Sequence, residues 1–139
     1  MSRNLTIAVT QMACTPDFEE NRDRAEKLIR DAASKGAQVI LLQELFEGPY
    51  FCKDQNPDYF NWAQPAENHP LLERFSSLAK ELEVVLPVSF FESVENVFFN
   101  SLALLDSDGG CQGIYRKSHI PDGPGYHCLL YTSDAADDP

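Results

Sequence analysis

The feature that most constrains this fold is an apolar strand, an amphipathic helix and a second apolar strand joined by short connections. Residues 5–12 (LTIAVTQM) are rich in β-branched and apolar side chains, which favours a buried strand. Apolar side chains at helical spacing then predict one buried helix face, made of Ala25, Leu28, Ile29, Ala32 and Ala33. Gly36 ends this helix, and the apolar strand 38–42 follows at once. This order predicts a parallel or mixed sheet with a helical layer against it.

The following residues continue the layered pattern. Pro70 opens a second helix, where its missing N–H costs little. The apolar stripe of this helix comprises Leu71, Leu72, Phe75, Leu78, Ala79 and Leu82. Residues 84–91 predict a further strand, in which Pro87 implies an edge, a bulge or an irregular end. Residues 97–105 and 111–116 predict a hairpin around a DSDGG turn. The expected fold class is therefore α/β, with the element order β-α-β-α-β-β-β.

Composition and charge exclude several classes of function. The 139 residues suffice for one domain with a core, and 43% hydrophobic with 24% charged residues is a globular balance. The net charge of −11 and the scattered basic residues leave no footprint for nucleic acid. Apolar runs are only a few residues long, so we expect no membrane span. The start of the chain resembles neither a secretory signal nor a transit peptide, so we expect a cytoplasmic protein.

The cysteines and histidines do not follow the spacing of a metal site. Cys14, Cys52, Cys111 and Cys128 form no CxxC pair, and the three histidines are equally unclustered. In a chain without an export signal we expect these cysteines to be free thiols. We therefore expect neither a metal ion nor another cofactor.

The end of the chain differs in character from everything before it. Residues 128–139 (CLLYTSDAADDP), when back-translated, match a transposase-adapter sequence used in library preparation and read in frame. The first base of the adapter would also become the third base of codon 127, so that a native codon starting with CA would be read as His127. We therefore expect residues 1–127 to be the N-terminal part of one domain, with native sequence ending at Tyr126 or within codon 127, and residues 128–139 to be a non-native tail. A natural acidic tail is the alternative.

Two charged side chains stand where predicted strands end. Glu44 comes just after the strand 38–42, and Lys117 directly follows the strand 111–116. In layered α/β sheets, side chains at the carboxyl ends of strands converge on the natural place for a ligand. A carboxylate there can take up a proton, and an ammonium can stabilise a developing oxyanion, but neither supplies a nucleophile. On position alone, a solvated ion pair is the alternative.

Longer blocks of the sequence resemble a known family. The stretches LTIAVTQM, VILLQELFEGPYFC and GIYRKSHIPDGPGY are similar to blocks of the carbon–nitrogen hydrolase (nitrilase) superfamily. Within it the chain most resembles the N-carbamoylputrescine amidases, over residues 5–126, roughly the first half of a family member. The strand-end Glu and the RK-x-H motif are shared widely, whereas ELFEGPYFC and YRKSHIPDGPGY are specific to the amidase branch. The resemblance implies a nitrilase-like αββα sandwich, truncated to about its first half.

The resemblance also implies a Glu–Lys–Cys triad. Carried over by position, Glu44 is the general base that activates a cysteine thiol, and Lys117 faces the oxyanion of the tetrahedral intermediate. The implied reaction cleaves the ureido C–N bond of N-carbamoylputrescine to putrescine, carbon dioxide and ammonia, in polyamine biosynthesis. The resemblance thus implies a small cationic ureido substrate, no cofactor, and homo-oligomers of the full-length protein.

The sequence departs from the family pattern at the nucleophile. In the family this cysteine lies on a later strand, in a block resembling ICWDQWFPE that is absent here, as is the second active-site glutamate expected just after Tyr126. Cys52 lies in a loop outside the nucleophile position, so we interpret it as a packed or pocket-lining thiol, and Cys14 and Cys111 as structural. His119 is expected to brace the loop that carries Lys117. We expect the chain as written to be catalytically inactive.

The loop 48–69 and its surroundings supply candidate substrate-binding residues. Tyr50 and Phe51 suit the methylene chain of a diamine derivative, and Glu47 suits its distal ammonium. Loop packing is the alternative for all three. Residues 45–60 contain no arginine for a carboxylate-bearing substrate. Another superfamily amidase, β-ureidopropionase-like or ω-amidase-like, remains the alternative enzyme, and a catalytically silent oligomer partner is the non-enzyme alternative.

Overall fold

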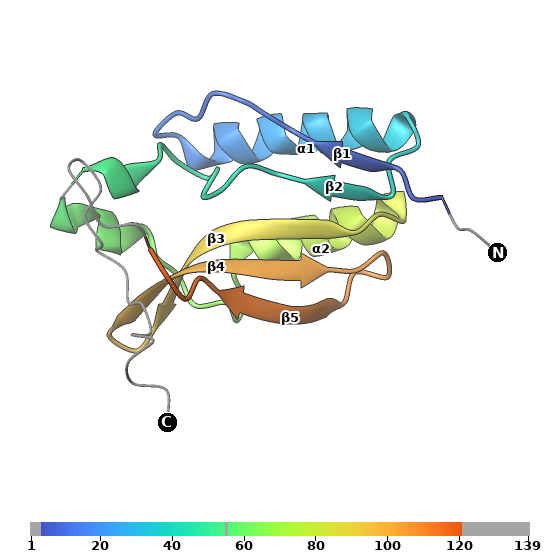
Figure 1. Ribbon diagram of the computed structural model, residues 1–139. Helices are drawn as coiled ribbons and strands as arrows, with labels where there is room; N and C mark the ends of the chain where they lie inside the picture. Colours follow the sequence, from blue (N-terminus) through green and yellow to red (C-terminus); the bar gives the residue numbers. More distant parts are fainter. Residues whose placement is uncertain (1–3, 55, 121–139) are drawn as a thin grey trace.

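The computed structural model describes residues 4–54 and 56–120 and contains the predicted series of strands and helices (Figure 1). The elements are β1 (Ile7–Val9), α1 (Phe18–Ser34), β2 (Val39–Leu41), η1 (Phe51–Lys53), η2 (Pro57–Trp62), α2 (Pro70–Leu82), β3 (Leu86–Val94), β4 (Val97–Leu105) and β5 (Cys111–Arg116). The expected order of strands and helices is confirmed. The two short 3₁₀ helices, η1 and η2, lie in the segment expected to be a loop.

The strands form two hydrogen-bonded groups that lie side by side. β1 and β2 pair in parallel, whereas β3, β4 and β5 form an antiparallel group in that order. Val85, just before β3, joins the groups through a parallel bridge with Val39 and backbone hydrogen bonds with Gln38 and Ile40. Pro87 lies in β3, on an outer strand of the antiparallel group and just past the bridge from Val85 to β2.

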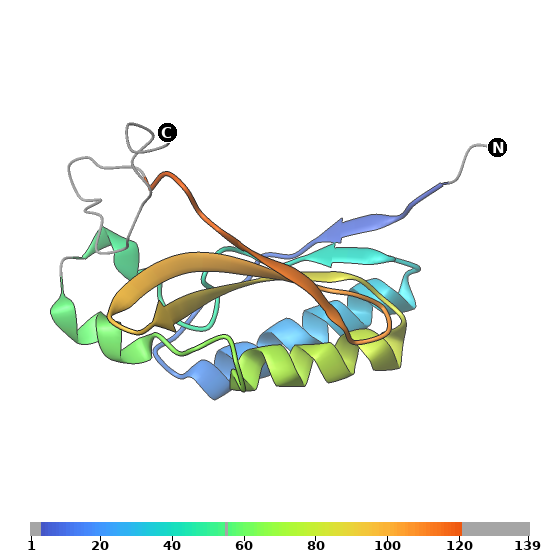
Figure 2. The same cartoon turned by 90° about the horizontal axis from the view of Figure 1, so that it is seen from below.

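Both helices cover the same face of the sheet (Figure 2). The Asp17 carboxylate caps α1, and Gly36, with a φ of 87°, follows its last turn. The ring nitrogen Nδ1 of His69 caps α2 by accepting the Leu71 N–H, and Pro70 takes the first helical position. Side chains that are at most 1% exposed fill the space between helices and sheet, among them Ile29, Ile40, Phe75, Phe90 and Leu105.

The opposite face of the sheet carries exposed apolar side chains. Because side chains alternate along a strand, the residues between the core positions point to this second face. The exposed apolar residues there are Ile7, Val9, Leu41, Leu104 and Tyr115. Val9 is 76% exposed and Tyr115 is 62% exposed, so this face has no cover from the part of the chain that the structure describes. The described residues therefore form one helical layer on one side of a sheet.

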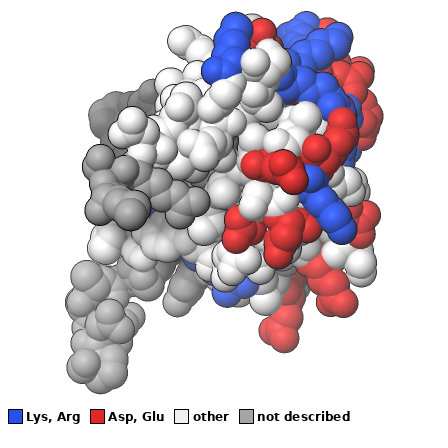
Figure 3. Space-filling model, turned by 90° about the vertical axis from the view of Figure 1, so that its right-hand side faces the viewer, with Lys and Arg blue, Asp and Glu red and all other residues white. Residues whose placement is uncertain are grey.

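Ion pairs of mixed sign lie on the outer surface of the helices. Arg30 of α1 bonds Glu26 of the same helix and Glu81 of α2, and Lys35 pairs with Asp31. Figure 3 shows acidic and basic side chains interspersed at the end of the molecule where α1 and α2 finish. Among the described residues, no helix is long and apolar enough to cross a membrane.

Candidate active site

The structure brings Glu44 and Lys117 into direct contact, although they lie 73 positions apart. Lys117 Nζ donates to Glu44 Oε1 at 2.9 Å. Glu44 lies in the turn after β2, and Lys117 directly follows β5, so strands from both hydrogen-bonded groups contribute to the pair. The side chains are 42% and 33% exposed, which leaves both accessible from solvent. These are the two residues that strand-end reasoning singles out, and the contact lies where it predicts.

Asn100 of β4 contacts both members of this pair. Its side-chain Nδ2 donates to Glu44 Oε1 at 2.6 Å, and its backbone carbonyl accepts the Lys117 N–H at 2.9 Å. Asn100 is only 6% exposed. Sequence reasoning missed this residue, although a buried amide inside the apolar strand VFFNSLALL is a detectable signal, since buried polar groups require partners.

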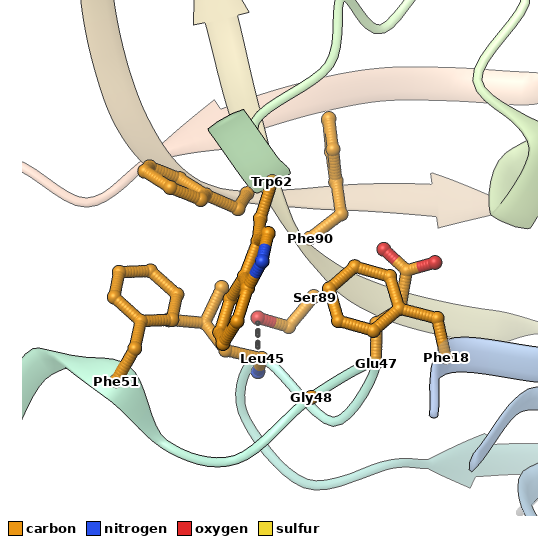
Figure 4. A pocket seen from close by; sticks show the side chains of 9 residues that line it. Phe18, Leu45, Glu47, Gly48, Phe51, Trp62, Ser89 and Phe90 are labelled. Carbon is orange, nitrogen blue, oxygen red and sulfur yellow. Dashed lines mark hydrogen bonds between the residues drawn. The ribbon is translucent and has the colours of Figure 1, made fainter. Parts of the chain in front are cut away.

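The turn that carries Glu44 is anchored on both sides of it. The Gln43 side chain accepts the Met12 N–H at 2.8 Å and donates to the Met12 carbonyl at 2.9 Å. Leu45 adopts a left-handed conformation, with a φ of 51°, and its N–H donates to Ser89 Oγ at 3.0 Å (Figure 4). Such a φ is strained for a branched residue, so the surrounding contacts must hold it. The anchors therefore fix the backbone from which Glu44 projects.

A hollow of about 450 Å³ lies beside the pair on the uncovered sheet face. Its lining includes Leu42, Ser89, Leu102 and Tyr115 as well as the charged pair. This volume is in the range of pockets for small molecules, and its apolar walls with a few convergent polar groups are typical of them. The hollow is the place where a substrate can reach Glu44 and Lys117.

Glu47 lies away from this pair, in a buried contact with α1. Its Oε1 accepts from Arg22 Nε at 2.7 Å, and its Oε2 lies 3.9 Å from His69 Nε2. The Asn21 side chain donates to the Glu47 carbonyl at 2.8 Å. Burial raises the pKa of Glu47, and the Arg22 charge and hydrogen bond oppose that shift. The structure thus gives Glu47 a cationic partner within the chain.

A small aromatic cavity of about 20 Å³ adjoins Glu47, with Phe18, Phe51 and Trp62 among its walls (Figure 4). A space of this size holds about one water molecule. Phe51 is 4% exposed and packs on Phe91, with ring centroids 4.6 Å apart, whereas Tyr50 is at the surface. The structure does not gather Glu47 and Phe51 around the Glu44–Lys117 pair.

The other candidate groups are placed as follows. Cys52 is 8% exposed, and its pKa is raised by burial, although a hydrogen bond with the Tyr50 side chain opposes the shift. The Glu44 charge also raises the pKa of this thiol, and the Lys117 charge lowers it. His119 is exposed and has no hydrogen bond or ion pair with another described residue, so its bracing role stays a prediction. Within residues 4–54 and 56–120, no group of three His, Cys, Asp or Glu side chains could hold a metal ion.

A helical layer on one face of a mixed sheet, with Glu and Lys meeting at strand ends, fits part of a nitrilase-type hydrolase. The chain belongs to the carbon–nitrogen hydrolase family, whose sequence model matches residues 6–134. Over 94% of its length it superposes on 46% of a carbon–nitrogen hydrolase from Helicobacter pylori G27, with a TM-score of 0.85 and 30% identity. The expected fold class is therefore confirmed.

Curated relatives share more of the sequence. The chain is 55% identical over 127 residues to the N-carbamoylputrescine amidase of Oryza sativa subsp. japonica, covering 91% of this chain and 42% of the relative. It is 42% identical over 130 residues to the citrullinase of Francisella tularensis, covering 94% of this chain and 46% of the relative. The chain thus spans less than half the length of these proteins.

Proposed function

We propose that this chain is the N-terminal part of an amidohydrolase that converts N-carbamoylputrescine to putrescine, carbon dioxide and ammonia. The observation that carries the proposal is the 2.9 Å contact between Glu44 Oε1 and Lys117 Nζ beside an open hollow. A carboxylate and an ammonium held together are the acid–base and charge-stabilising groups that amide hydrolysis needs. The 55% identity to the rice amidase supports the choice of substrate.

In the proposed mechanism, Glu44 accepts the proton of a cysteine thiol supplied by the rest of the full-length protein. The thiolate attacks the ureido carbonyl, and Lys117 stabilises the oxyanion that forms. Collapse of this intermediate breaks the C–N bond, and ammonia leaves with the proton that Glu44 returns. Water then hydrolyses the carbamoyl-enzyme to a carbamate, which decomposes to carbon dioxide and the amine.

The proposal also accounts for the chain being shorter than the relatives that it matches. Exposed apolar residues such as Val9 and Tyr115 suit a sheet face that the remaining length of the relatives would cover. Residues 128–139, proposed as a non-native tail, lie outside the described residues, as do His127 and Tyr126. In this proposal the 139-residue chain is inactive, because the cysteine nucleophile belongs to the rest of the full-length protein.

The substrate-binding roles of Glu47, Tyr50 and Phe51 stay predictions. Tyr50, at the surface and hydrogen-bonded to Cys52, suits contact with the methylene chain of the substrate. Glu47 is buried against Arg22 and Phe51 is packed in its aromatic cluster, so their contact with substrate requires a different loop arrangement in the full-length protein. We further propose that the complete enzyme is a cytoplasmic homo-oligomer acting in polyamine biosynthesis.

The first experiment is to sequence the genomic reading frame through and beyond codon 127 and to express its full product. The product is assayed for ammonia and free amine with three substrates: N-carbamoylputrescine, 3-ureidopropionate and an ω-amide of a dicarboxylic acid. Preferred release of putrescine is the expected result. Preference for either acid substrate would replace the proposal with the β-ureidopropionase-like or ω-amidase-like alternative.

Two variants test the site itself. Glu44→Gln and Lys117→Met are each expected to lower kcat by about 10³-fold or more, because each removes a group that acts on the reacting atoms. Cys52→Ser is the matched control, since its thiol lies near the pair but outside the proposed chemistry. An in-frame stop soon after codon 126 in the genome would instead favour a catalytically silent oligomer partner.

A further inference from the structure

Asn100 occupies a position that only the folded chain reveals. It lies inside β4 opposite Phe91 of β3, and the next β4 residue, Ser101, pairs with Arg116 of β5. This register places Lys117 beside Asn100, whose carbonyl accepts the Lys117 N–H at 2.9 Å. Any residue at position 100 would offer the same backbone carbonyl to Lys117. This hydrogen bond therefore does not explain why the side chain is that of asparagine.

The two oxygens of the Glu44 carboxylate are in different environments. Asn100 Nδ2 and Lys117 Nζ both donate to Oε1, at 2.6 Å and 2.9 Å. Within residues 4–54 and 56–120, Oε2 accepts no hydrogen bond. A carboxylate has about four acceptor positions, so two donors on one oxygen hold its plane and leave the other oxygen available. The base function then falls to Oε2.

The chemical type of residue 100 fits this task. A neutral amide donates to the carboxylate without adding a charge, so the Glu44–Lys117 pair keeps its balance of one negative and one positive group. An aspartate there would repel Glu44, and an aliphatic residue would leave its carboxylate held by one flexible lysine. Burial of Asn100 also restricts its rotamers, so the donor stays aimed at Oε1.

We propose that Asn100 is a positioning residue that holds Glu44 through Oε1 and thereby presents Oε2 as the base in the proposed amidase reaction. The inference rests on the proposed function, but the contact that carries it is present in the chain without substrate. Asn100 acts through Glu44 and does not touch the reacting atoms.

The test uses Asn100→Ala, Asn100→Leu and, as a matched control, Asn56→Ala. Asn56 also makes a hydrogen bond through its side chain, by accepting the Asp58 N–H, but it caps η2 and does not contact the Glu44–Lys117 pair. In the full-length enzyme, Asn100→Ala is expected to lower kcat about 10- to 100-fold with KM changed less than about threefold, because one charge-assisted hydrogen bond is lost. Asn56→Ala is expected to leave kcat unchanged.

A second measurement does not need activity. In the 139-residue chain, the ¹³C resonance of the Glu44 carboxylate at fixed pH is expected to shift in Asn100→Ala and to stay in place in Asn56→Ala. If Asn100→Ala does not fold, the uncharged and similarly sized Asn100→Leu replaces it, with the same expected results. A folded variant with unchanged kcat, or an unmoved Glu44 resonance, overturns the positioning role. A wild-type enzyme without amidase activity overturns the proposed function but leaves the resonance test intact.

Discussion

Arg116 of β5 holds Glu92 of β3 through two parallel hydrogen bonds that reach across β4. Arg116 Nε donates to Glu92 Oε2 at 2.8 Å, and Nη2 donates to Oε1 at 2.7 Å. Ser101 of β4 adds a third donor to Glu92 Oε2 at 2.6 Å, and the guanidinium lies 4.5 Å from the Phe99 ring centre. Since Lys117 follows Arg116 directly, this contact fixes the strand end from which Lys117 projects.

The Arg116–Glu92 pair is expected to stabilise the fold by more than a surface ion pair does. Arg116→Met leaves the Glu92 carboxylate, which is 2% exposed, with one neutral donor, and should lower the free energy of unfolding by about 2 kcal/mol. Arg116→Lys should recover only part of it, because an ammonium cannot make the bidentate contact. Urea unfolding measures the loss in both variants. The control is Lys35→Met, in an exposed helical ion pair, where the expected loss is below about 0.5 kcal/mol. Equal losses at both sites would contradict this expectation.

The same pair is expected to make stability depend on pH in the acid range. Burial alone would raise the pKa of Glu92, but hydrogen bonds from Arg116 and Ser101 and the Arg116 charge outweigh it and hold the pKa below its ordinary value. A lowered carboxyl pKa means that the stabilisation is full at neutral pH and is lost as pH falls through the folded-state pKa. The difference in unfolding free energy between wild type and Glu92→Gln should therefore shrink as pH falls from 6 to below about 4. A difference that stays constant with pH would exclude Glu92 as the source of the pH dependence.

His69 is expected to destabilise the fold on mild acidification. Burial, and secondly the Arg22 charge, lowers the pKa of His69 to about 4 from an ordinary value of 6.5. Its Nδ1 accepts the Leu71 N–H, so Nε2 carries the proton and faces Glu47. Because the unfolded chain takes up a proton first, stability should fall between pH 6.5 and 4, by up to about 3 kcal/mol from this group.

The matched variant for this effect is His69→Asn. Asparagine keeps an acceptor for the α2 cap but does not titrate, so its unfolding free energy should vary less over the same pH range. The measurement is urea unfolding at half-unit pH steps for wild type and variant. Parallel curves for the two proteins would assign the pH dependence to other groups.

Local sequence patterns were sufficient for the order of elements and for one pair at the site. Strand and helix periodicity depends on residues close in the chain, and the carboxyl ends of strands are readable from it, so the Glu44–Lys117 contact could be anticipated. The strand expected over residues 5–12 is shorter in the structure, where β1 covers Ile7–Val9. Beyond β1, the Met12 backbone forms hydrogen bonds with the Gln43 side chain and not with a neighbouring strand.

The contacts that could not be anticipated all depend on register or on distant neighbours. Asn100 meets Glu44 only because β4 pairs with β3 in one register, and a shift by one residue would turn its side chain to the other face. Glu47 looks like a free carboxylate in the sequence, yet Arg22, 25 positions earlier, is buried against it. Arg22 lies three and seven positions before Ala25 and Ile29, on the side of the apolar stripe, but helical periodicity cannot say what lies over it.

Glu47→Gln separates the structural role of this carboxylate from its predicted role toward substrate. The contact with Arg22 leads us to expect a loss of about 2 kcal/mol in the unfolding free energy, since the variant leaves a buried guanidinium with Glu19 as its one remaining charged partner among the described residues. Contact with the substrate ammonium would instead raise KM for N-carbamoylputrescine in the full-length enzyme and leave it unchanged for a neutral ureido substrate. Unfolding and KM measured on the same variants decide between them, with Glu67→Gln, at an exposed position, as control.

The thiols of the described chain are expected to react with alkylating agents in the order of their exposure. Cys111 is exposed, Cys14 is half-buried and Cys52 is buried. Burial raises the pKa of Cys52, and also that of Cys14, where the Arg24 charge partly opposes it. Because the thiolate is the reactive form, Cys111 should be modified by iodoacetamide at least about ten times faster than Cys52 at pH 8.

Peptide-resolved mass spectrometry measures the rate at each thiol in a Cys128→Ser background, which removes the cysteine outside the described residues. Unfolding in guanidinium is the control, since it should bring the rates at Cys111 and Cys52 together once burial is lost. Native Cys52 that reacts as fast as Cys111 would contradict its burial and would reopen it as a nucleophile beside Glu44. Slow modification is the outcome that agrees with a nucleophile supplied by the rest of the full-length protein.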